Sequence, residues 1–296
     1  MQVTCLAGRG AILGEGPVWD AARGCLWWID IEGRCLHCYD AATGQNSVQA
    51  MPGRPGFVAL HVTGQLVLGI ERAIVLFDPV AGKGVTLAEV DAEGVRINDG
   101  FCDSDGQLWF GTMDDNVAQP LGALYRLNPD GPEAAITGVI ASNGPAFSTD
   151  GRSLFHCDTL GRQILHYPLL PGGNLGPGTV FRTFAEDEGL PDGMACDTDG
   201  GLWVGLWGGG CVVRLDQSGA VSSRVSVSAT QVTACAFGGP KLDMLFITTA
   251  ALGLSRSDLA AAPDSGELFI CSPGWQGMAP TPMQDLNLTY EWTPRT

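Results

Sequence analysis

Short apolar runs separated by turn residues recur along the whole chain. The clearest example is Leu202-Trp203-Val204-Gly205-Leu206, which follows the acidic turn at residues 197–201. Runs of this length that are bounded by Gly, Asp and Ser are typical of β-strands rather than helices. Only residues 258–262 suggest a helix, and they could form a single turn. The pattern therefore predicts an all-β protein.

The apolar runs belong to a repeat with a spacing of roughly 40 to 50 residues, which is typical of propellers and solenoids. Six similar second strands are CLWWID (25–30), QLVLGI (65–70), QLWFGT (107–112), SLFHCD (153–158), GLWVGL (201–206) and MLFITT (244–249). Six third strands follow them: CLHCYD (35–40), AIVLFD (73–78), ALYRLN (123–128), QILHYP (163–168), CVVRLD (211–216) and ELFICS (267–272).

Four short strands in each of six units predict a six-bladed β-propeller with four-stranded antiparallel blades. We expect residues 1–296 to form one domain, because a blade cannot bury both of its faces alone. Closure of the ring requires the first and last blades to share strands. Residues 2–6 are therefore expected to pair with the blade that contains residues 267–272.

The first strand of each blade lines the central channel, so equivalent positions in different blades should converge on the axis. These positions are Glu15, Gly56, Asn98, Asn143, Asp192 and Thr233. Any one of the Asn-Gly or Asp-Gly pairs is typical of a turn. Two carboxylates and two amides at one position of the blade instead favour an oxygen-rich site for Ca²⁺, Mg²⁺ or Mn²⁺, and Zn²⁺ or Fe²⁺ also fits.

Composition narrows the possible partners. A formal net charge of −16 argues against nucleic acid and anionic membranes, which require a basic surface. No apolar window approaches the length of about 18 residues that spans a bilayer. The ten cysteines are scattered except for Cys35 and Cys38, so we expect reduced thiols and a cytoplasmic protein.

Six motifs in chain order resemble the senescence-marker-protein/gluconolactonase/regucalcin family, in its bacterial sugar lactonase branch. They are Leu13-Gly14-Glu15-Gly16-Pro17, Arg96-Ile97-Asn98-Asp99-Gly100, Gly111-Thr112-Met113, Ser142-Asn143-Gly144, Pro191-Asp192-Gly193 and Cys235-Ala236-Phe237-Gly238-Gly239. The resemblance covers residues 12–274. Trp207-Gly208-Gly209 is similar to the bacterial branch, whereas residues 114–122 are short where the family often carries a longer lid.

The resemblance implies a reaction and its site residues. It implies that Glu15, Asn143 and Asp192 bind one divalent metal ion (Ca, Zn, Mn, Mg or Fe(II)). It also implies that Arg96 and Asn98 bind the sugar and that Asp192 is the catalytic base. The reaction would be hydrolysis of a sugar lactone, such as glucono-, xylono-, arabinono- or galactonolactone, to the aldonic acid. Such a protein would act on a small molecule as a monomer or weak homo-oligomer.

The sequence is also compatible with other functions. A calcium-binding regulatory propeller would bind metal without lactone turnover, and a phosphotriesterase-like hydrolase would need a cage richer in carboxylates and amides. Serine-histidine-aspartate catalysis is the rival mechanism, but the four histidines fall in strand-like runs away from the axial positions, and no G-x-S-x-G motif occurs. Trp207 could be either a sugar platform or part of the blade packing.

Overall fold

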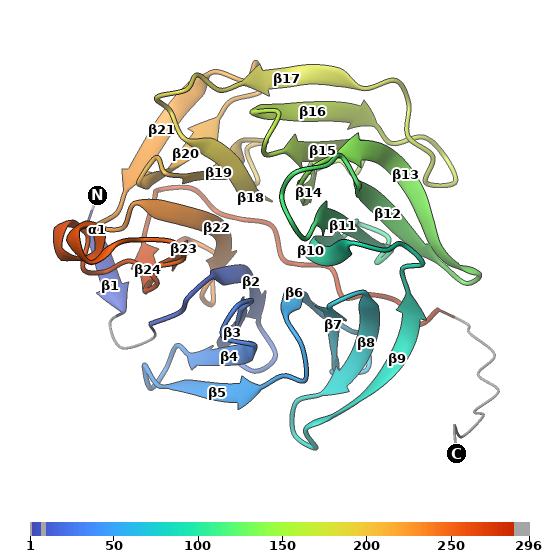
Figure 1. Ribbon diagram of the computed structural model, residues 1–296, viewed down its shortest axis with the longest axis horizontal. Helices are drawn as coiled ribbons and strands as arrows, with labels where there is room; N and C mark the ends of the chain where they lie inside the picture. Colours follow the sequence, from blue (N-terminus) through green and yellow to red (C-terminus); the bar gives the residue numbers. More distant parts are fainter. Residues whose placement is uncertain (1, 7–9, 287–296) are drawn as a thin grey trace.

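The computed structural model describes residues 2–6 and 10–286, and its strands form six four-stranded antiparallel sheets arranged in a ring (Figure 1). From the axis outward, the first three blades are β2 (Gly14–Asp20), β3 (Cys25–Asp30), β4 (Cys35–Asp40), β5 (Asn46–Ala50); β6 (Pro55–Leu60), β7 (Leu66–Ile70), β8 (Ala73–Asp78), β9 (Lys83–Glu89); and β10 (Val95–Cys102), β11 (Leu108–Asp114), β12 (Gly122–Asn128), β13 (Gly131–Val139).

The remaining blades continue the same order. They are β14 (Ser142–Phe147), β15 (Ser153–Asp158), β16 (Gln163–Pro168), β17 (Thr179–Thr183); β18 (Leu190–Cys196), β19 (Leu202–Trp207), β20 (Cys211–Leu215), β21 (Val221–Ser226); and β22 (Gln231–Gly238), β23 (Met244–Ala250), β24 (Leu268–Cys271), β1 (Val3–Leu6). The predicted six-bladed, all-β fold is confirmed, and the predicted second and third strands lie within two residues of the observed ones.

The first and last strands of the described chain close the ring. β1 pairs antiparallel with β24, with Val3 opposite Cys271 and Leu6 opposite Leu268. The sixth blade therefore takes its outermost strand from the N-terminus, as predicted. Helix α1 (Arg256–Ala261) lies between β23 and β24 and starts with a capping box formed by Ser255 and Asp258. No helix in the described residues is long and apolar enough to cross a membrane.

A repeated aspartate fixes the first turn of blades 1, 3 and 5. In each blade its carboxylate accepts backbone N–H bonds within the turn and the indole N–H of a tryptophan on the second strand. The three pairs are Asp20 with Trp27 (3.2 Å), Asp103 with Trp109 (3.0 Å) and Asp197 with Trp203 (2.8 Å). This bond explains why the sequence pattern Asp-turn-Gly-x-Leu-Trp recurs, since the same carboxylate closes the turn and anchors the strand.

Asp197→Asn is expected to destabilise the fold. Asp197 is fully buried and accepts bonds from Arg214 Nε at 2.6 Å and Arg214 Nη2 at 3.1 Å. Burial by itself would raise the pKa of Asp197, but the bonds from Arg214, Gly201 and Trp203 lower it overall. The asparagine variant leaves the Arg214 charge unpaired, and breaking such a buried pair costs about 3–5 kcal/mol. Urea unfolding measures the loss; a change below about 1 kcal/mol would contradict it.

The C-terminal segment after β24 crosses the far end of the central channel (Figure 1). Its backbone bonds reach blades on both sides of the ring, because Thr198 N donates to Gln276 O, Met283 N to Leu60 O, and Gln284 N to Gly106 O. The ring is thus closed twice, once by the β1–β24 pair and once by this segment. No periodic pattern marked residues 275–284 as structured, because their contacts are single backbone bridges.

Candidate functional site

All six innermost strands are irregular at one level of the channel. The antiparallel register shifts between Glu15 and Val18, Pro55 and Phe57, Ile97 and Asp99, Asn143 and Ala146, Pro191 and Met194, and Val232 and Cys235. A bulge re-aims the side chain beside it and interrupts pairing. Two of the six shifts depend on a glycine, since Gly16 and Gly144 have φ values of 52° and 74°, where other residues are strained.

The bulges bring the predicted axial residues together. Asn98 Nδ2 donates to Asn143 Oδ1 at 2.6 Å and to Ser142 O at 3.2 Å, across the boundary between blades 3 and 4. Thr233 Oγ1 donates to Gly14 O at 2.6 Å, which joins blade 6 to blade 1 beside Glu15. Glu15, Asn98, Asn143 and Asp192 are buried, with 6–8% of their surface exposed, and Thr233 is fully buried. The sequence positions that the repeat aligned are therefore neighbours at one end of the axis.

The carboxylates of this cluster carry poorly compensated charge. Burial raises the pKa of Asp192 well above its usual range, and the negative charge of Asp99 raises it further. The pKa of Glu15 is raised in the same direction by burial, then by Asp192 and Asp99. Within the described residues, neither Glu15 nor Asp192 has an ion-pair partner within 4.0 Å. A buried group of like charges is costly unless a cation neutralises it.

Asp99 is a further member of the cluster; the sequence analysis named it within a family motif but gave it no role in the site. Its Oδ1 accepts from Gly100 N at 2.7 Å and its Oδ2 from Gly144 N at 2.9 Å. Burial raises its pKa to about 7 despite these two bonds. The part of Asp99 that is exposed faces the internal channel. Its position directly after Asn98 in the Asn-Asp-Gly motif was the one sequence feature that could have predicted its place in the cluster.

The donor set fits a hard divalent cation. Within the described residues, no three His, Cys, Asp or Glu side chains group as a metal site on their own. The side chains that could hold a cation here are the carboxylates of Glu15 and Asp192 together with the amide oxygen of Asn143. Asn143 Nδ2 donates to Thr159 Oγ1 at 2.8 Å, while its Oδ1 accepts from Asn98 Nδ2 and has a second lone pair that a cation could use. Two carboxylates and an amide oxygen are ligands that Ca²⁺, Mg²⁺ and Mn²⁺ prefer.

Arg96 supplies the positive side of the site. It is buried, and its Nη1 donates to Ile97 O at 3.1 Å. Burial lowers its pKa, and the nearby positive charge of Arg54 lowers it further, while Glu32, Asp115 and Glu15 act in the opposite direction. The guanidinium has five N–H donors and uses one in the bond to Ile97 O. The others can serve hydroxyl or carbonyl oxygens of a ligand.

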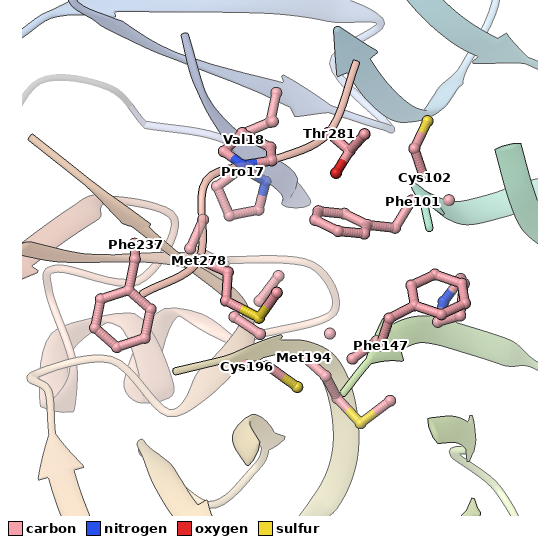
Figure 2. Close-up of a pocket in the computed structure, with 18 of the residues that line it drawn as sticks. Pro17, Val18, Phe101, Cys102, Phe147, Met194, Cys196, Phe237, Met278 and Thr281 are labelled. Carbon is pink, nitrogen blue, oxygen red and sulfur yellow. The ribbon is translucent and has the colours of Figure 1, made fainter. Parts of the chain in front are cut away.

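Beyond the cluster, the channel widens into an apolar cavity of about 110 Å³ (Figure 2). Its lining includes Phe101, Phe147, Met194 and Phe237, and Met278 of the C-terminal segment covers its far side. Apart from Asp99, this lining offers few groups that could recognise a polar molecule. The charged side chains of Glu15, Arg96 and Asp192 lie close together beyond this cavity, at the polar end of the axis.

A serine-histidine pair occurs behind the cluster but does not form a catalytic triad. Ser142 Oγ lies 2.9 Å from His156 Nε2, and both residues are fully buried. The other ring nitrogen of His156 has no hydrogen-bond partner in the described structure, so no carboxylate orients the ring. Burial lowers the pKa of His156 to about 4. In this arrangement His156 contacts the side chain of Ser142, the neighbour of Asn143 in the chain.

The structure shows the contacts of the Trp207 side chain and of the short segment at residues 114–122. Trp207 is half-buried and packs against the core cluster that contains Leu13 and Ala250. The short segment at residues 114–122 is a turn whose backbone N–H groups at 116, 118 and 119 bond to the Asp114 carboxylate. Asp115 then projects toward Arg54 from the next blade, a contact that no sequence pattern indicated.

Fold and site together define a six-bladed propeller with a carboxylate and amide cluster at one end of its axis. The profile of the SMP-30/Gluconolactonase/LRE-like region matches residues 13–251. The chain belongs to this family.

Individual relatives cover nearly the whole chain. An L-arabinolactonase of Azospirillum brasilense is 35% identical over 284 residues, which are 94% of each chain. A 6-deoxy-6-sulfogluconolactonase of Pseudomonas putida is 34% identical and covers 90% of this chain and 92% of its own. Among solved structures, a calcium-binding protein, regucalcin, from Agrobacterium tumefaciens superposes with a TM-score of 0.90 at 30% identity, covering 94% of this chain and 96% of that chain.

Proposed function

We propose that this protein hydrolyses a sugar lactone to the corresponding aldonic acid in a reaction that depends on one divalent cation. The observation that carries the proposal is the buried convergence of Glu15, Asn143 and Asp192 beside Arg96 and Asn98. Lactonase relatives that match 84–94% of the chain support the reaction class. The calcium-binding relative supports a cation.

Glu15, Asn143 and Asp192 would hold the cation through their side-chain oxygens. A divalent cation bound there supplies Lewis acidity, which polarises a lactone carbonyl and lowers the pKa of water. Thr159 keeps the Asn143 amide in the orientation that presents its oxygen. Asp99 adds negative charge close to Glu15 and Asp192, which strengthens the attraction of the cluster for a cation.

Asp192 is the general base of the proposed reaction. It accepts a proton from the water whose oxygen attacks the carbonyl carbon. The ring C–O bond then breaks, and the proton on Asp192 passes to the departing ring oxygen, so that the product is a hydroxy acid. Burial and Asp99 raise the pKa of Asp192, and a raised carboxyl pKa suits proton transfer near neutral pH.

Arg96 and Asn98 bind the sugar. The free N–H groups of Arg96 donate to hydroxyl oxygens, while the Asn98 amide, held by Asn143 and Ser142, offers its oxygen as an acceptor. The cluster contains more carboxylates than basic groups, which favours a neutral polyhydroxylated ring over an anionic one. An aldono-1,4- or 1,5-lactone meets this description.

The direct test is a panel of aldonolactones assayed with Ca²⁺, Mg²⁺, Mn²⁺, Zn²⁺ or Fe²⁺ added to chelator-treated protein. Turnover of at least one lactone with at least one cation is the expected result. Binding of a cation by calorimetry without turnover of any lactone would instead identify a regulatory calcium-binding propeller. Turnover of a phosphotriester alone would identify the second alternative.

We also place the protein in a reducing compartment, the cytoplasm. None of its ten cysteines forms a disulfide in the described structure, and most are buried thiols. Reducing compartments keep such thiols unpaired. Thiol titration of protein purified without reductant and then denatured should detect all ten. Detection of six or fewer would mean that oxidised pairs form in the cell and would contradict this placement.

A further inference from the structure

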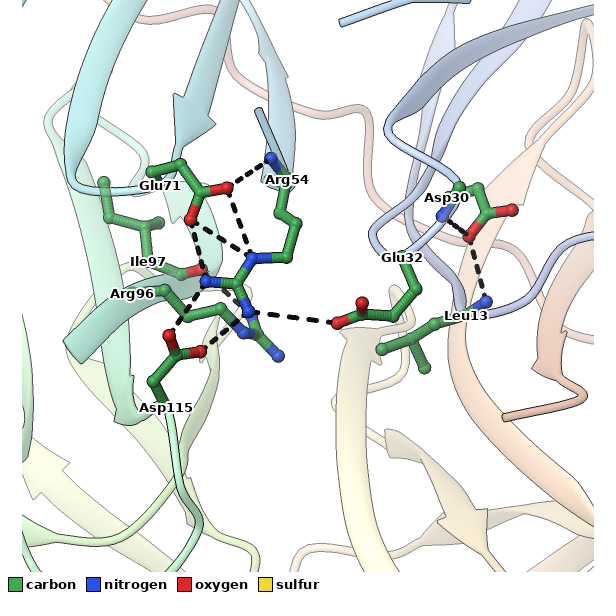
Figure 3. Close-up of polar contacts among 9 residues, drawn as sticks. Leu13, Asp30, Glu32, Arg54, Glu71, Arg96, Ile97 and Asp115 are labelled. Carbon is green, nitrogen blue, oxygen red and sulfur yellow. Dashed lines mark hydrogen bonds and ion pairs between the residues drawn. The ribbon is translucent and has the colours of Figure 1, made fainter. Parts of the chain in front are cut away.

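Arg54 joins the loops of three blades at the polar end of the axis (Figure 3). Its Nη2 lies 2.8 Å from Glu71 Oε2, and its Nε lies 3.1 and 3.2 Å from the two oxygens of the same carboxylate. Its Nη1 and Nη2 lie 2.7 and 3.0 Å from the oxygens of Asp115, and Glu32 Oε1 is 4.0 Å from Nη1. Glu32, Glu71 and Asp115 follow the second strands of blades 1, 2 and 3.

The same residues hold the backbone on both sides of Arg96. Ile97 N donates to Glu71 O at 2.6 Å, and Asp115 N donates to Gly94 O at 2.9 Å. Glu71 in turn exchanges bonds with Arg54, because Arg54 N donates to Glu71 Oε1 at 2.8 Å and Glu71 N donates to Arg54 O at 3.0 Å. Arg54 and the strand that carries Arg96 are therefore linked through hydrogen bonds to Glu71.

Arg96 itself has no anion to hold its side chain. In residues 2–6 and 10–286 it forms no ion pair within 4.0 Å, and its one bond runs to its neighbour's carbonyl. Glu32 and Asp115 are nevertheless close enough to stabilise its charge. Arg54 already occupies Glu71 and Asp115 with bidentate bonds, which are the strongest arginine–carboxylate contacts. Its own charge also repels a second guanidinium from them.

We propose that Arg54 is a positioning residue that occupies Glu71 and Asp115 and thereby keeps Arg96 available to bind the hydroxyl groups of the substrate. This inference rests on the proposed function. It also assigns a role to the short turn at residues 114–122. The turn presents Asp115 to the clamp formed by Arg54, Glu71 and Asp115, and in this way forms one wall of the site in place of a long lid.

Arg54→Gln tests the proposal through a comparison of two substrates. With the clamp lost, Arg96 turns to Asp115, and the KM of a polyhydroxylated lactone rises about tenfold, the equivalent of one charge-assisted hydrogen bond. The KM of γ-butyrolactone, which has no hydroxyl groups, changes less than about twofold, because only ground-state contacts to hydroxyls are removed. Metal affinity by calorimetry stays unchanged. Equal rises in both KM values would overturn the proposal, since they would indicate a general structural defect.

The double variant Arg54→Gln/Asp115→Asn provides the rescue. Removing the charge of Asp115 removes the competitor for Arg96, so most of the lost affinity for the hydroxylated lactone should return. Arg126→Gln is the matched control, because Arg126 also pairs with a surface carboxylate, Glu133 at 2.9 Å, in the outer part of blade 3. It makes the same charge change, and neither KM should move. Failure of the double variant to recover would overturn the proposal.

A crystal structure of Arg54→Gln separates this inference from the proposed function. The expected result is an Arg96 guanidinium within ion-pair distance of Asp115 or Glu71. An Arg96 side chain in its present orientation would overturn the inference, whether or not the protein hydrolyses lactones. Conversely, an absence of lactone turnover in the unsubstituted protein would contradict the proposed function. The position of Arg96 in the Arg54→Gln crystal structure would still test the inference.

Discussion

Asp192→Asn should lower kcat by about 10²- to 10⁴-fold while the protein stays folded. This range is the usual contribution of a positioned general base. An asparagine still offers a neutral oxygen to a cation, as Asn143 does, but it cannot accept a proton from water. Steady-state rates at saturating metal measure the loss, and thermal unfolding checks the fold. The variant should retain part of its metal affinity by calorimetry.

Glu15→Gln is the matched comparison for Asp192→Asn. Both substitutions remove one buried negative charge from the same cluster and keep the side-chain shape. Glu15 has no role in proton transfer in the proposed reaction, so excess metal should restore most of the activity of Glu15→Gln. If excess metal restored both variants to near the unsubstituted rate, Asp192 would be a ligand alone, and the base would have to be another group.

Removal of the cation by a chelator should abolish lactone turnover and also change how stability depends on pH. Burial raises the folded-state pKa values of Glu15 and Asp192, and raises that of Asp99 to about 7. A carboxyl group with a raised folded-state pKa binds more protons in the folded state than in the unfolded state. Its contribution to stability is therefore present at low pH and lost as pH rises through the folded-state value.

The chelated protein should accordingly have a higher Tm near pH 5.5 than near pH 8. Saturating metal should raise the Tm at pH 8 and reduce this dependence, because the cation neutralises the ionised carboxylates; binding at about 100 times Kd is worth roughly 2.7 kcal/mol. Calorimetric scans of chelated and metal-loaded protein at both pH values provide the measurement. Asp192→Asn serves as a control, since its chelated form should be more stable at pH 8 than the chelated unsubstituted protein. A Tm that is independent of both pH and metal would argue against a cation at this cluster.

The sequence by itself determined the number of blades, the limits of the second and third strands to within two residues, and the positions that meet on the axis. These features follow from local chemistry. Alternation and strand length are set by the backbone, and an aspartate or glycine closes each turn within a few residues. Because a propeller repeats one unit around an axis, a position that recurs in the repeat, such as that of Asn143 or Asp192, also recurs in space. The closing strand at residues 2–6 was predictable for the same reason.

Tertiary structure alone decided what surrounds those axial residues. The partners of Arg54 are 17 and 61 residues away in the chain, and no repeat aligns them. In the sequence, Asp99 is typical of a turn residue. In the structure its carboxylate is buried, accepts a bond from Gly144 N and lies close enough to Asp192 to raise its pKa. The C-terminal segment carries no alternating pattern, and its position across the channel depends on isolated backbone bonds to blades 2, 3, 5 and 6. Periodic patterns report contacts that repeat, whereas these contacts each occur once and depend on how blades distant in sequence approach one another.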